Sequence, residues 1–204
     1  MAERTSILYN FINNPIIYQA IQKLMSGNSF RKKFLKENVK DKNLKILEVG
    51  CGSAEILKYI PVNEYYGYDI DPRSIQAAKQ NHPYENCYFF NKKLEKKDIS
   101  KLPNFDLILL FGILHHLNDT QAKKILDLCR KKMKKDAKLL ILDPIFTPNQ
   151  NIFARLLIKS DRGLNVRKED EYLNLFKKNF KNVKSKITNQ FFVPYTWFTT
   201  ICKK

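Results

Sequence analysis

The stretch KILEVGCGSAEIL at residues 45–57 ends an apolar run in two closely spaced glycines, Gly50 and Gly52. Glycine tolerates positive φ and lets a ligand lie against bare backbone, and free amides at the start of a helix bind polar ligand groups. A dinucleotide loop has a third glycine where this chain has Glu55, whose carboxylate would repel a pyrophosphate. The stretch therefore disfavours NAD, and Glu48 and Glu55 suit a phosphate-free cofactor with a cationic end.

Asp69 lies 17 residues after Gly52, in the segment YYGYDIDP, where a second strand is expected to end. A carboxylate there accepts hydrogen bonds from both hydroxyls of a ribose, each worth roughly 1.5–3 kcal/mol. Ile70 beside it offers an apolar face for an adenine. Asp69 could instead cap the next helix, but Asp71 before Pro72 fills that role better, so the ribose role is favoured.

His115 and His116 follow the apolar run FDLILLF and are the candidate catalytic residues. Histidine accepts a proton near neutral pH, which a hydroxyl acceptor would need to lose during a transfer reaction. The alternative is that one histidine caps backbone groups while the other packs against its neighbours. The residue types leave both roles open.

Candidate acceptor-binding residues follow further along the chain. Asp143 ends an expected strand, and Arg162 and Arg167 lie in the segment after it, where two arginines could hold an anionic acceptor. The favoured alternative for the arginines is a loop salt-bridged to Asp161 and Glu169.

Two tyrosines are also candidate pocket-lining residues. Tyr18 lies in the N-terminal segment and Tyr195 in the C-terminal one, and each could present a hydroxyl to an acceptor. Packing in the core or at the rim is the favoured alternative for both.

Alternating strand and helix patterns place these residues at strand ends. The expected strands are 44–49, 64–70, 86–91, 105–111 and 137–143, and the expected helices between them are 54–60, 72–81 and 120–134. A further helix is expected near 168–179, and two β-rich runs around Pro194 are expected to form an antiparallel pair. This alternation predicts an α/β doubly wound sheet, in which ligands bind beyond the carboxyl ends of the strands.

A chain of 204 residues predicts one domain. Two or three short helices are expected before the core. The expected parts are an N-terminal helical lid (1–42), a cofactor-binding core (43–145), and a substrate-side insertion with the C-terminal strands (146–204).

The segments ILEVGCGSAE, YYGYDIDPRSIQAAK and FDLILLFGILHHLND together resemble the successive motifs of class I S-adenosylmethionine-dependent methyltransferases, in order and spacing, over roughly residues 44–145. The resemblance implies a Rossmann-like seven-stranded sheet with a reversed, antiparallel last strand, and S-adenosylmethionine as the cofactor. It assigns cofactor contacts to Glu48, Gly50, Cys51, Gly52, Asp69, Ile70, Phe111 and Gly112. The segment after residue 145 and NNPIIYQAIQKL also resemble a bacterial subgroup of small methyltransferases.

Two positions depart from the family pattern. Ala54 stands where the first motif has its third glycine, and we expect the first turn of a helix there to tolerate a methyl group. The family's acidic adenine-binding residue after the third strand is replaced by the run Asn91-Lys92-Lys93-Leu94-Glu95, and lysine accepts no hydrogen bond. Asn91, Leu94 or a backbone carbonyl would have to bind the adenine.

The formal net charge is +17, and the excess is mostly lysine scattered in pairs. We favour solvated lysines over a dedicated nucleic-acid site, so nucleic acid stays an unfavoured partner. The four cysteines have no paired spacing, which predicts a reducing compartment and no metal. No apolar run is long enough to span a bilayer and no secretory signal is visible, so a cytoplasmic enzyme is expected.

The favoured function is methyl transfer to a small-molecule acceptor, with oxygen as the favoured atom. The run FGILHH lacks the Asn- or Asp-Pro-Pro-aromatic motif of enzymes that methylate base amino groups, and the chain has no Pro-Cys. A methyltransferase acting on RNA or another macromolecule, and a catalytically silent cofactor-binding protein, remain the alternatives.

Overall fold

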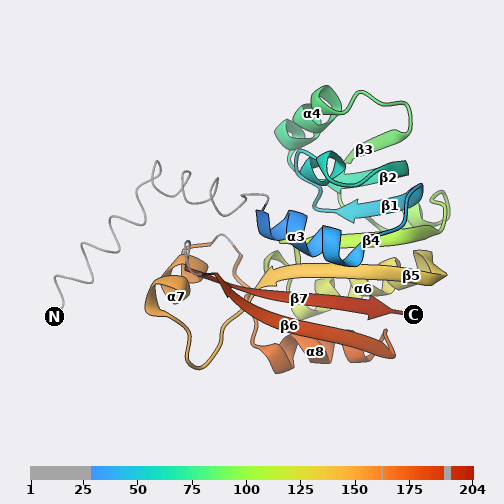
Figure 1. The fold of residues 1–204 in the computed structure, drawn as a ribbon. Coiled ribbons are helices and arrows are strands. Elements are labelled where there is room, and N and C mark those ends of the chain that lie inside the picture. The colour runs from blue at the N-terminus through green and yellow to red at the C-terminus, as the bar shows by residue number, and fades with distance from the viewer. Residues whose placement is uncertain (1–28, 162, 191–193) are drawn as a thin grey trace.

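The computed structural model describes residues 29–161, 163–190 and 194–204. Its centre is a seven-stranded sheet in the order β3-β2-β1-β4-β5-β7-β6 (Figure 1). The strands are β1 (Leu44–Val49), β2 (Val62–Asp69), β3 (Cys87–Asn91), β4 (Phe105–Phe111), β5 (Met133–Pro144), β6 (Asn182–Gln190) and β7 (Tyr195–Lys203).

Strands β1 to β5 pair in parallel, and strand order reverses between β1 and β4. The register places Glu48 of β1 between Gly67 of β2 and Leu109 of β4. Strand β4 is the most apolar strand because it lies in the middle of the sheet and is covered on both faces. Its carboxyl end, beside that of β1, is therefore the switch point where a ligand is expected.

The C-terminal strands confirm the expected reversed strand. Strand β7 pairs antiparallel with both β5 and β6, and its start lies at the carboxyl end of β5, where Trp197 faces Pro144. The chain thereby returns Tyr195 to the edge of the sheet at which β1 and β4 end.

Helices cover both faces of the sheet (Figure 1). One core cluster joins α3 (Ser29–Asn38), α4 (Pro72–Asn81) and α7 (Ile152–Lys159) to one face of the sheet. The other joins α6 (Asp119–Lys132) and α8 (Glu169–Lys177) to the opposite face, next to the single-turn α5 (Lys96–Ile99). Two 3-10 turns, η1 (Glu55–Lys58) and η2 (Leu114–His116), follow β1 and β4.

Several predicted elements differ from the structure. The helix expected over 54–60 is only the short 3-10 turn η1. The helix expected to reach residue 134 ends at Lys132, because Met133 already pairs with Phe105 in the sheet. The insertion expected after residue 145 contains the helix α7, for which no helix was predicted, and its buried residues are Ala154, Leu157 and Ile158.

The N-terminal helices expected before residue 29 lie outside the described residues, as does Tyr18. Among the helices that the structure describes, none is both long enough and apolar enough to cross a membrane.

Candidate functional site

The loop after β1 is held open by backbone geometry. Gly50 and Gly52 have φ of 77° and 54°, and the amides of Gly50 and Cys51 both donate to the carbonyl of Tyr68. A Cβ on Gly50 would lie 3.1 Å from the side chain of Ile113, whereas one on Gly52 would meet none of the described atoms within 4 Å. No described residue covers this side of Gly52, so its bare backbone can be approached by a ligand as far as the described residues are concerned.

Ala54 has a different conformation from the one expected. Its φ and ψ are 58° and 38°, in the left-handed region, and it directly precedes η1. The expectation of a methyl group in an ordinary helical turn was therefore wrong. The chain keeps the conformation that favours glycine and carries an alanine in it, fully buried, at a strain cost of about 1 kcal/mol.

Asp69 lies against this loop. Its Oδ2 accepts the Gly52 amide at 2.8 Å and its Oδ1 accepts the Asp71 amide at 2.9 Å, so the carboxylate is fixed at the carboxyl end of β2. Asp71 caps α4 by accepting the Arg73 amide at 3.2 Å, as predicted. Ile70 is 64% exposed and is an apolar surface open to a ligand.

Glu48 is a buried carboxyl group beneath the same loop. It is 3% exposed, and Tyr65 donates its hydroxyl to Glu48 Oε2 at 2.5 Å. Burial raises the pKa of Glu48 to about 7, although the Tyr65 hydrogen bond and the charge of Arg31 oppose this rise. A cation bound nearby would favour the ionised form.

Arg31 of α3 is a site residue that the sequence interpretation missed. Its Nη2 lies 3.5 Å from where a Cβ on Gly112 would be, and its charge acts on Glu48, Asp143 and Tyr195. Burial lowers the pKa of Arg31, and its Nε is buried without a hydrogen-bond partner among the described residues. The only sequence signal is a basic run that looks like an ordinary helix surface.

The end of β4 joins this region to the histidines. Phe111 is buried and its ring centroid lies 6.0 Å from that of Phe34 on α3, while Gly112 has φ of 69° and donates its amide to Leu142. A Cβ on Gly112 would lie 3.8 Å from Cε1 of His115.

His115 is held by Asp143 at the end of β5. Asp143 Oδ1 lies 2.6 Å from His115 Nδ1 and accepts the His115 amide at 3.0 Å. Burial alone would lower the pKa of His115, but Asp143 and Asp161 outweigh it and raise the pKa to about 9. Asp143 is fully buried, so it positions His115 and does not face an acceptor as expected.

The segment after α7 closes over His115. Asp161 Oδ1 lies 3.7 Å from His115 Nε2, and Tyr195 donates its hydroxyl to Asp161 Oδ2 at 3.0 Å. A Cβ on Gly163 would lie only 1.9 Å from His115 Cδ2, so only glycine allows this approach. The exposed His116 lies beside His115, with ring centroids 4.1 Å apart.

The structure gives Arg167 a role other than the expected one. Its buried guanidinium donates to Asp119 at 3.0 Å and to the carbonyls of Leu114, Asn165 and Leu117. Arg167 therefore fastens the segment over the histidines and is not a group that meets an acceptor.

Two further expectations have other outcomes. Arg162 lies outside the described residues. Glu55 is paired with Lys58 at 2.8 Å, so it offers a bound cation less charge than expected.

Asp98 is an acidic residue that follows β3, and the sequence interpretation did not name it. It lies in the short helix α5. Lys92 lies 2.5 Å from the buried Asp98, whose other oxygen accepts the Glu95 amide. Leu94 is buried in the core, whereas the Asn91 amide group donates to the backbone carbonyl of Asp69. Of the expected adenine contacts, Asn91 is the one that lies beside the ribose-binding candidate.

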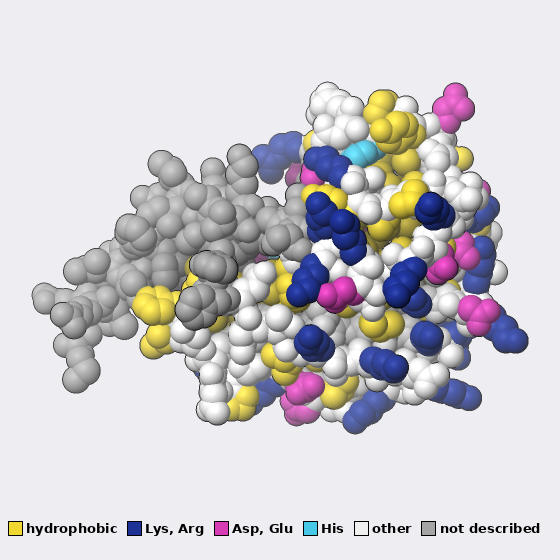
Figure 2. Space-filling model, in the orientation of Figure 1, with side chains coloured by type: hydrophobic (Ala, Val, Ile, Leu, Met, Phe, Trp, Pro, Cys, Tyr) yellow, Lys and Arg dark blue, Asp and Glu magenta, His cyan; other side chains and the backbone are white. Residues whose placement is uncertain are grey.

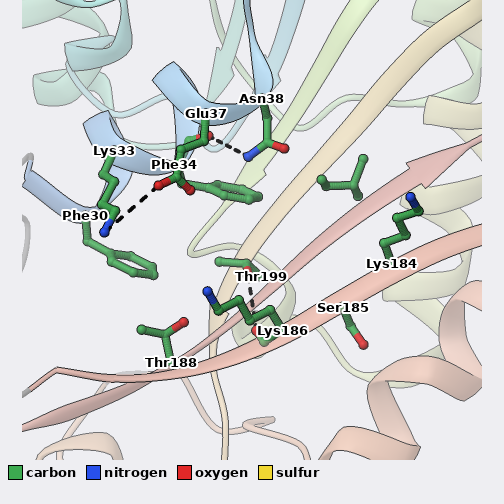
Figure 3. Close-up of a pocket in the computed structure, with 11 residues that line it drawn as sticks. Phe30, Lys33, Phe34, Glu37, Asn38, Lys184, Ser185, Lys186, Thr188 and Thr199 are labelled. Atoms are coloured by element: carbon green, nitrogen blue, oxygen red, sulfur yellow. Dashed lines mark hydrogen bonds and ion pairs between the residues drawn. The ribbon is translucent and has the colours of Figure 1, made fainter.

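A groove of about 250 Å³ lies between α3 and strands β6 and β7. Figure 3 shows Lys33, Lys184 and Lys186 around it, Phe30 and Phe34 on the helix side, and Glu37 paired with Lys33. On the face shown in Figure 2, Lys and Arg side chains are dispersed with acidic side chains between them.

Comparisons with known proteins identify the class. A family model described as "Methyltransferase domain" matches residues 47–139. A protein named as a methyltransferase, 235L of Invertebrate iridescent virus 6, is 26% identical over 178 residues, covering 81% of this chain and 65% of its own length. Desmethylxanthohumol 6'-O-methyltransferase of Humulus lupulus is 28% identical over 112 residues, covering 52% of this chain and 30% of its own length.

A TehB-like SAM-dependent methyltransferase of Corynebacterium glutamicum has the same fold, with a TM-score of 0.61, 18% identity, and coverage of 93% of this chain and 96% of that one. Residues 47–139 match a methyltransferase domain model, and the chain has the fold of S-adenosylmethionine-dependent methyltransferases. It spans less than two thirds of the length of the two curated relatives named above.

The residues present fit S-adenosylmethionine. The cofactor ends in an amino acid and carries a sulfonium. On one side this site offers the Glu48 carboxyl group and Arg31, whose Nε has no hydrogen-bond partner within the described part of the chain. On the other side lie the Asp69 carboxylate and the exposed Ile70, which suit a ribose and an adenine.

Proposed function

We propose that the chain transfers a methyl group from S-adenosylmethionine to an oxygen atom of a small-molecule acceptor. The observation that carries this proposal is the position of His115, His116 and Asp161 directly beyond Gly112, next to the cofactor-binding loop. The named activity of the Humulus lupulus relative, an O-methyltransferase, supports oxygen as the acceptor atom.

On the cofactor side, each residue has a distinct task. Asp69 accepts the ribose hydroxyls, Glu48 attracts the positively charged amino acid end, and Arg31 binds its carboxylate. Gly50 and Gly52 let the cofactor lie against backbone. These contacts would follow from the positions of the side chains around one switch point.

The Asn91 side-chain oxygen is a candidate acceptor for the adenine amino group. Its amide nitrogen already donates to the Asp69 carbonyl, which orients the side chain at the carboxyl edge of β2 and β3. An amide oxygen accepts a hydrogen bond where the neighbouring lysines do not.

On the acceptor side, the group formed by His115, His116 and Asp161 is where the hydroxyl proton is lost. The bound cofactor supplies an already activated methyl group on its sulfonium. The remaining task of the protein is to align the acceptor oxygen with that methyl group in a site shielded from water. The segment fastened by Arg167 and the buried Tyr195 provide this shielding around His115.

The test is a methyl-transfer assay on the full chain with panels of hydroxyl-bearing and amine-bearing small molecules, read by mass spectrometry of the product. Product methylated on oxygen is expected, and His116→Ala should lower turnover by about 100-fold, in the range of a lost proton-transfer group, with cofactor affinity unchanged. Asp127→Asn, which removes a carboxylate paired with Lys131 on the surface of α6, is the matched control. Methylation of nitrogen alone would refute the choice of oxygen, and cofactor binding without any turnover would favour a silent cofactor-binding protein.

A macromolecular acceptor is the second candidate, and the lysine-lined groove in Figure 3 is the observation that favours it. Binding of RNA through Lys33, Lys184 and Lys186 would weaken steeply with salt, since each neutralised phosphate releases counterions. A filter-binding titration at two salt concentrations, repeated with the three lysines changed to glutamine, separates this candidate from a small-molecule enzyme.

A further inference from the structure

Three groups that bind metals in other proteins converge beyond the end of β4. The possible ligand atoms, one from each of His115, His116 and Asp161, all lie within 4.8 Å of one another. Among the described residues, no other group of at least three His, Cys, Asp or Glu side chains has this arrangement. No sequence motif predicts this group, because Asp161 lies 45 residues after His116 and reaches His115 only through the fold.

The hydrogen bonds of His115 set which nitrogen is available. Asp143 can only accept at Nδ1, where the separation is 2.6 Å, so the Nδ1 atom carries the proton. In the neutral ring Nε2 then has a lone pair, and it faces Asp161 Oδ1 at 3.7 Å. That distance is too long for a direct hydrogen bond, but it is near the roughly 3.4 Å that separates two ligands of one tetrahedral Zn²⁺ ion.

The surrounding charges favour a cation between these atoms. Asp143 and Asp161 are both carboxylates beside one buried imidazole, with side-chain exposures of 0% and 14%. The charge of Arg31 acts on Asp143, and the partly buried Asp161 favours a further positive charge beside His115, which either a proton or a metal ion can supply. The Tyr195 hydroxyl donates a hydrogen bond to Oδ2 of Asp161, and Oδ1 is the oxygen that faces His115.

The contact between Asp143 and His115 also resembles the hydrogen bond that orients a metal-binding histidine in other proteins. Histidines that bind metals usually donate their other ring N–H to a carboxylate, which fixes the tautomer and makes the ligand nitrogen more basic. Asp143 does this from the end of β5, and its second oxygen accepts the Leu114 amide at 3.4 Å, so the support is built on the sheet.

We propose that His115, His116 and Asp161 bind a divalent transition-metal ion of the Zn²⁺ type. Two imidazoles and one carboxylate suit such an ion better than Mg²⁺, which prefers oxygen ligands. Three protein ligands leave a fourth position open, as in catalytic zinc sites.

The inference rests on the proposed function, because the open position is where the acceptor oxygen would bind. A bound ion would lower the pKa of the acceptor hydroxyl. The O–H bond would break, leaving its electron pair on oxygen and releasing the proton to solvent. That oxygen would then form a bond to the methyl carbon while the bond between this carbon and sulfur breaks, its electron pair returning to sulfur. In this arrangement His116 acts as a ligand and not as the group that receives the proton.

The first test measures metal uptake directly, without cofactor or acceptor. The full chain, produced without a histidine tag and stripped with a chelator, is titrated with Zn²⁺ by calorimetry and with Co²⁺ by visible absorption. One ion per chain and the intense absorption of tetrahedral Co²⁺ are expected. His116→Ala and Asp161→Asn should each weaken binding by at least about tenfold, and Asp143→Asn by about 10–100-fold. The surface change Asp127→Asn should leave binding unchanged.

Two results would overturn the inference. One is the absence of uptake by the wild-type chain, and the other is uptake that survives both His116→Ala and Asp161→Asn, which marks an adventitious ion. Since His116 is exposed, its replacement should leave the fold intact, as circular dichroism would check.

The second test separates this inference from the proposed function. If an acceptor is methylated on oxygen at the same rate before and after chelation, the metal inference fails while the function stands. If one ion binds at this group but no acceptor is methylated, the function fails while the metal site stands.

Discussion

The substitution Glu48→Gln should make the free protein more stable while weakening cofactor binding. In the folded chain, burial raises the pKa of Glu48 from 4.5 to about 7. As the pH rises the unfolded chain therefore ionises first, and folding loses stability between those two values. The loss is complete above the folded pKa and amounts to about 3 kcal/mol for a shift of this size.

Glutamine keeps the shape of the Glu48 side chain and still accepts a hydrogen bond from the Tyr65 hydroxyl, but it cannot ionise. The variant should match the wild type well below about pH 4.5 and exceed it by up to about 3 kcal/mol above about pH 7, a difference that already includes the attraction between Arg31 and Glu48. Urea unfolding across this pH range measures the difference.

Cofactor binding should change in the opposite direction. Glu48 in its charged form attracts the cationic cofactor, and losing one charge-assisted contact costs about 1.5–3 kcal/mol, or about 10–100-fold in affinity. Calorimetry with S-adenosylhomocysteine measures this loss.

Glu64→Gln is the matched control, because Lys45 lowers the pKa of Glu64, so this variant should gain no stability as the pH rises. A Glu48→Gln protein that is less stable than the wild type at every pH would refute the reasoning. A variant that binds the cofactor as tightly as the wild type would refute the assignment of Glu48 to the cofactor.

Other substitutions test the remaining parts of the site. Asp69→Asn should weaken cofactor affinity by about 10–100-fold in calorimetry, since it removes the charged acceptor for the ribose, and tight NAD binding by the wild type would contradict that role. Ala54→Gly should raise the unfolding free energy by about 0.5–1 kcal/mol, because it relieves the left-handed strain, and a loss of stability in urea unfolding would show that the strain is absent. Gly163→Ala should abolish turnover but keep cofactor affinity, because its methyl group would overlap the His115 ring, and full activity would contradict the packing of this segment on the histidine.

The fold was largely predictable because its strands carry strong, local signals. The runs 44–49 and 105–111 were predicted at the bounds that β1 and β4 have, since both are mostly apolar strands in the middle of the sheet. The helix over 72–81 was predicted at its bounds because Asp71 and Pro72 mark its start. The turn after Ala54 was mispredicted because a left-handed alanine has no sequence signature.

The two halves of the candidate site differ in how far sequence reveals them. Cofactor-side positions lie at the ends of successive strands, so the spacing from Gly52 to Asp69 reports a real juxtaposition, and the structure joins them by a hydrogen bond of 2.8 Å. The acceptor side depends on contacts between distant segments, such as Asp161 with His115, which no local pattern encodes. Arg31 was missed as a site residue, and Arg167 was wrongly expected to meet an acceptor. Both errors have one cause, because each arginine acquires its role only from the carboxylates and carbonyls that the fold brings to it. The chemistry that distinguishes this chain within its class should therefore be sought in the segments that cover the sheet edge, since they supply the groups around His115.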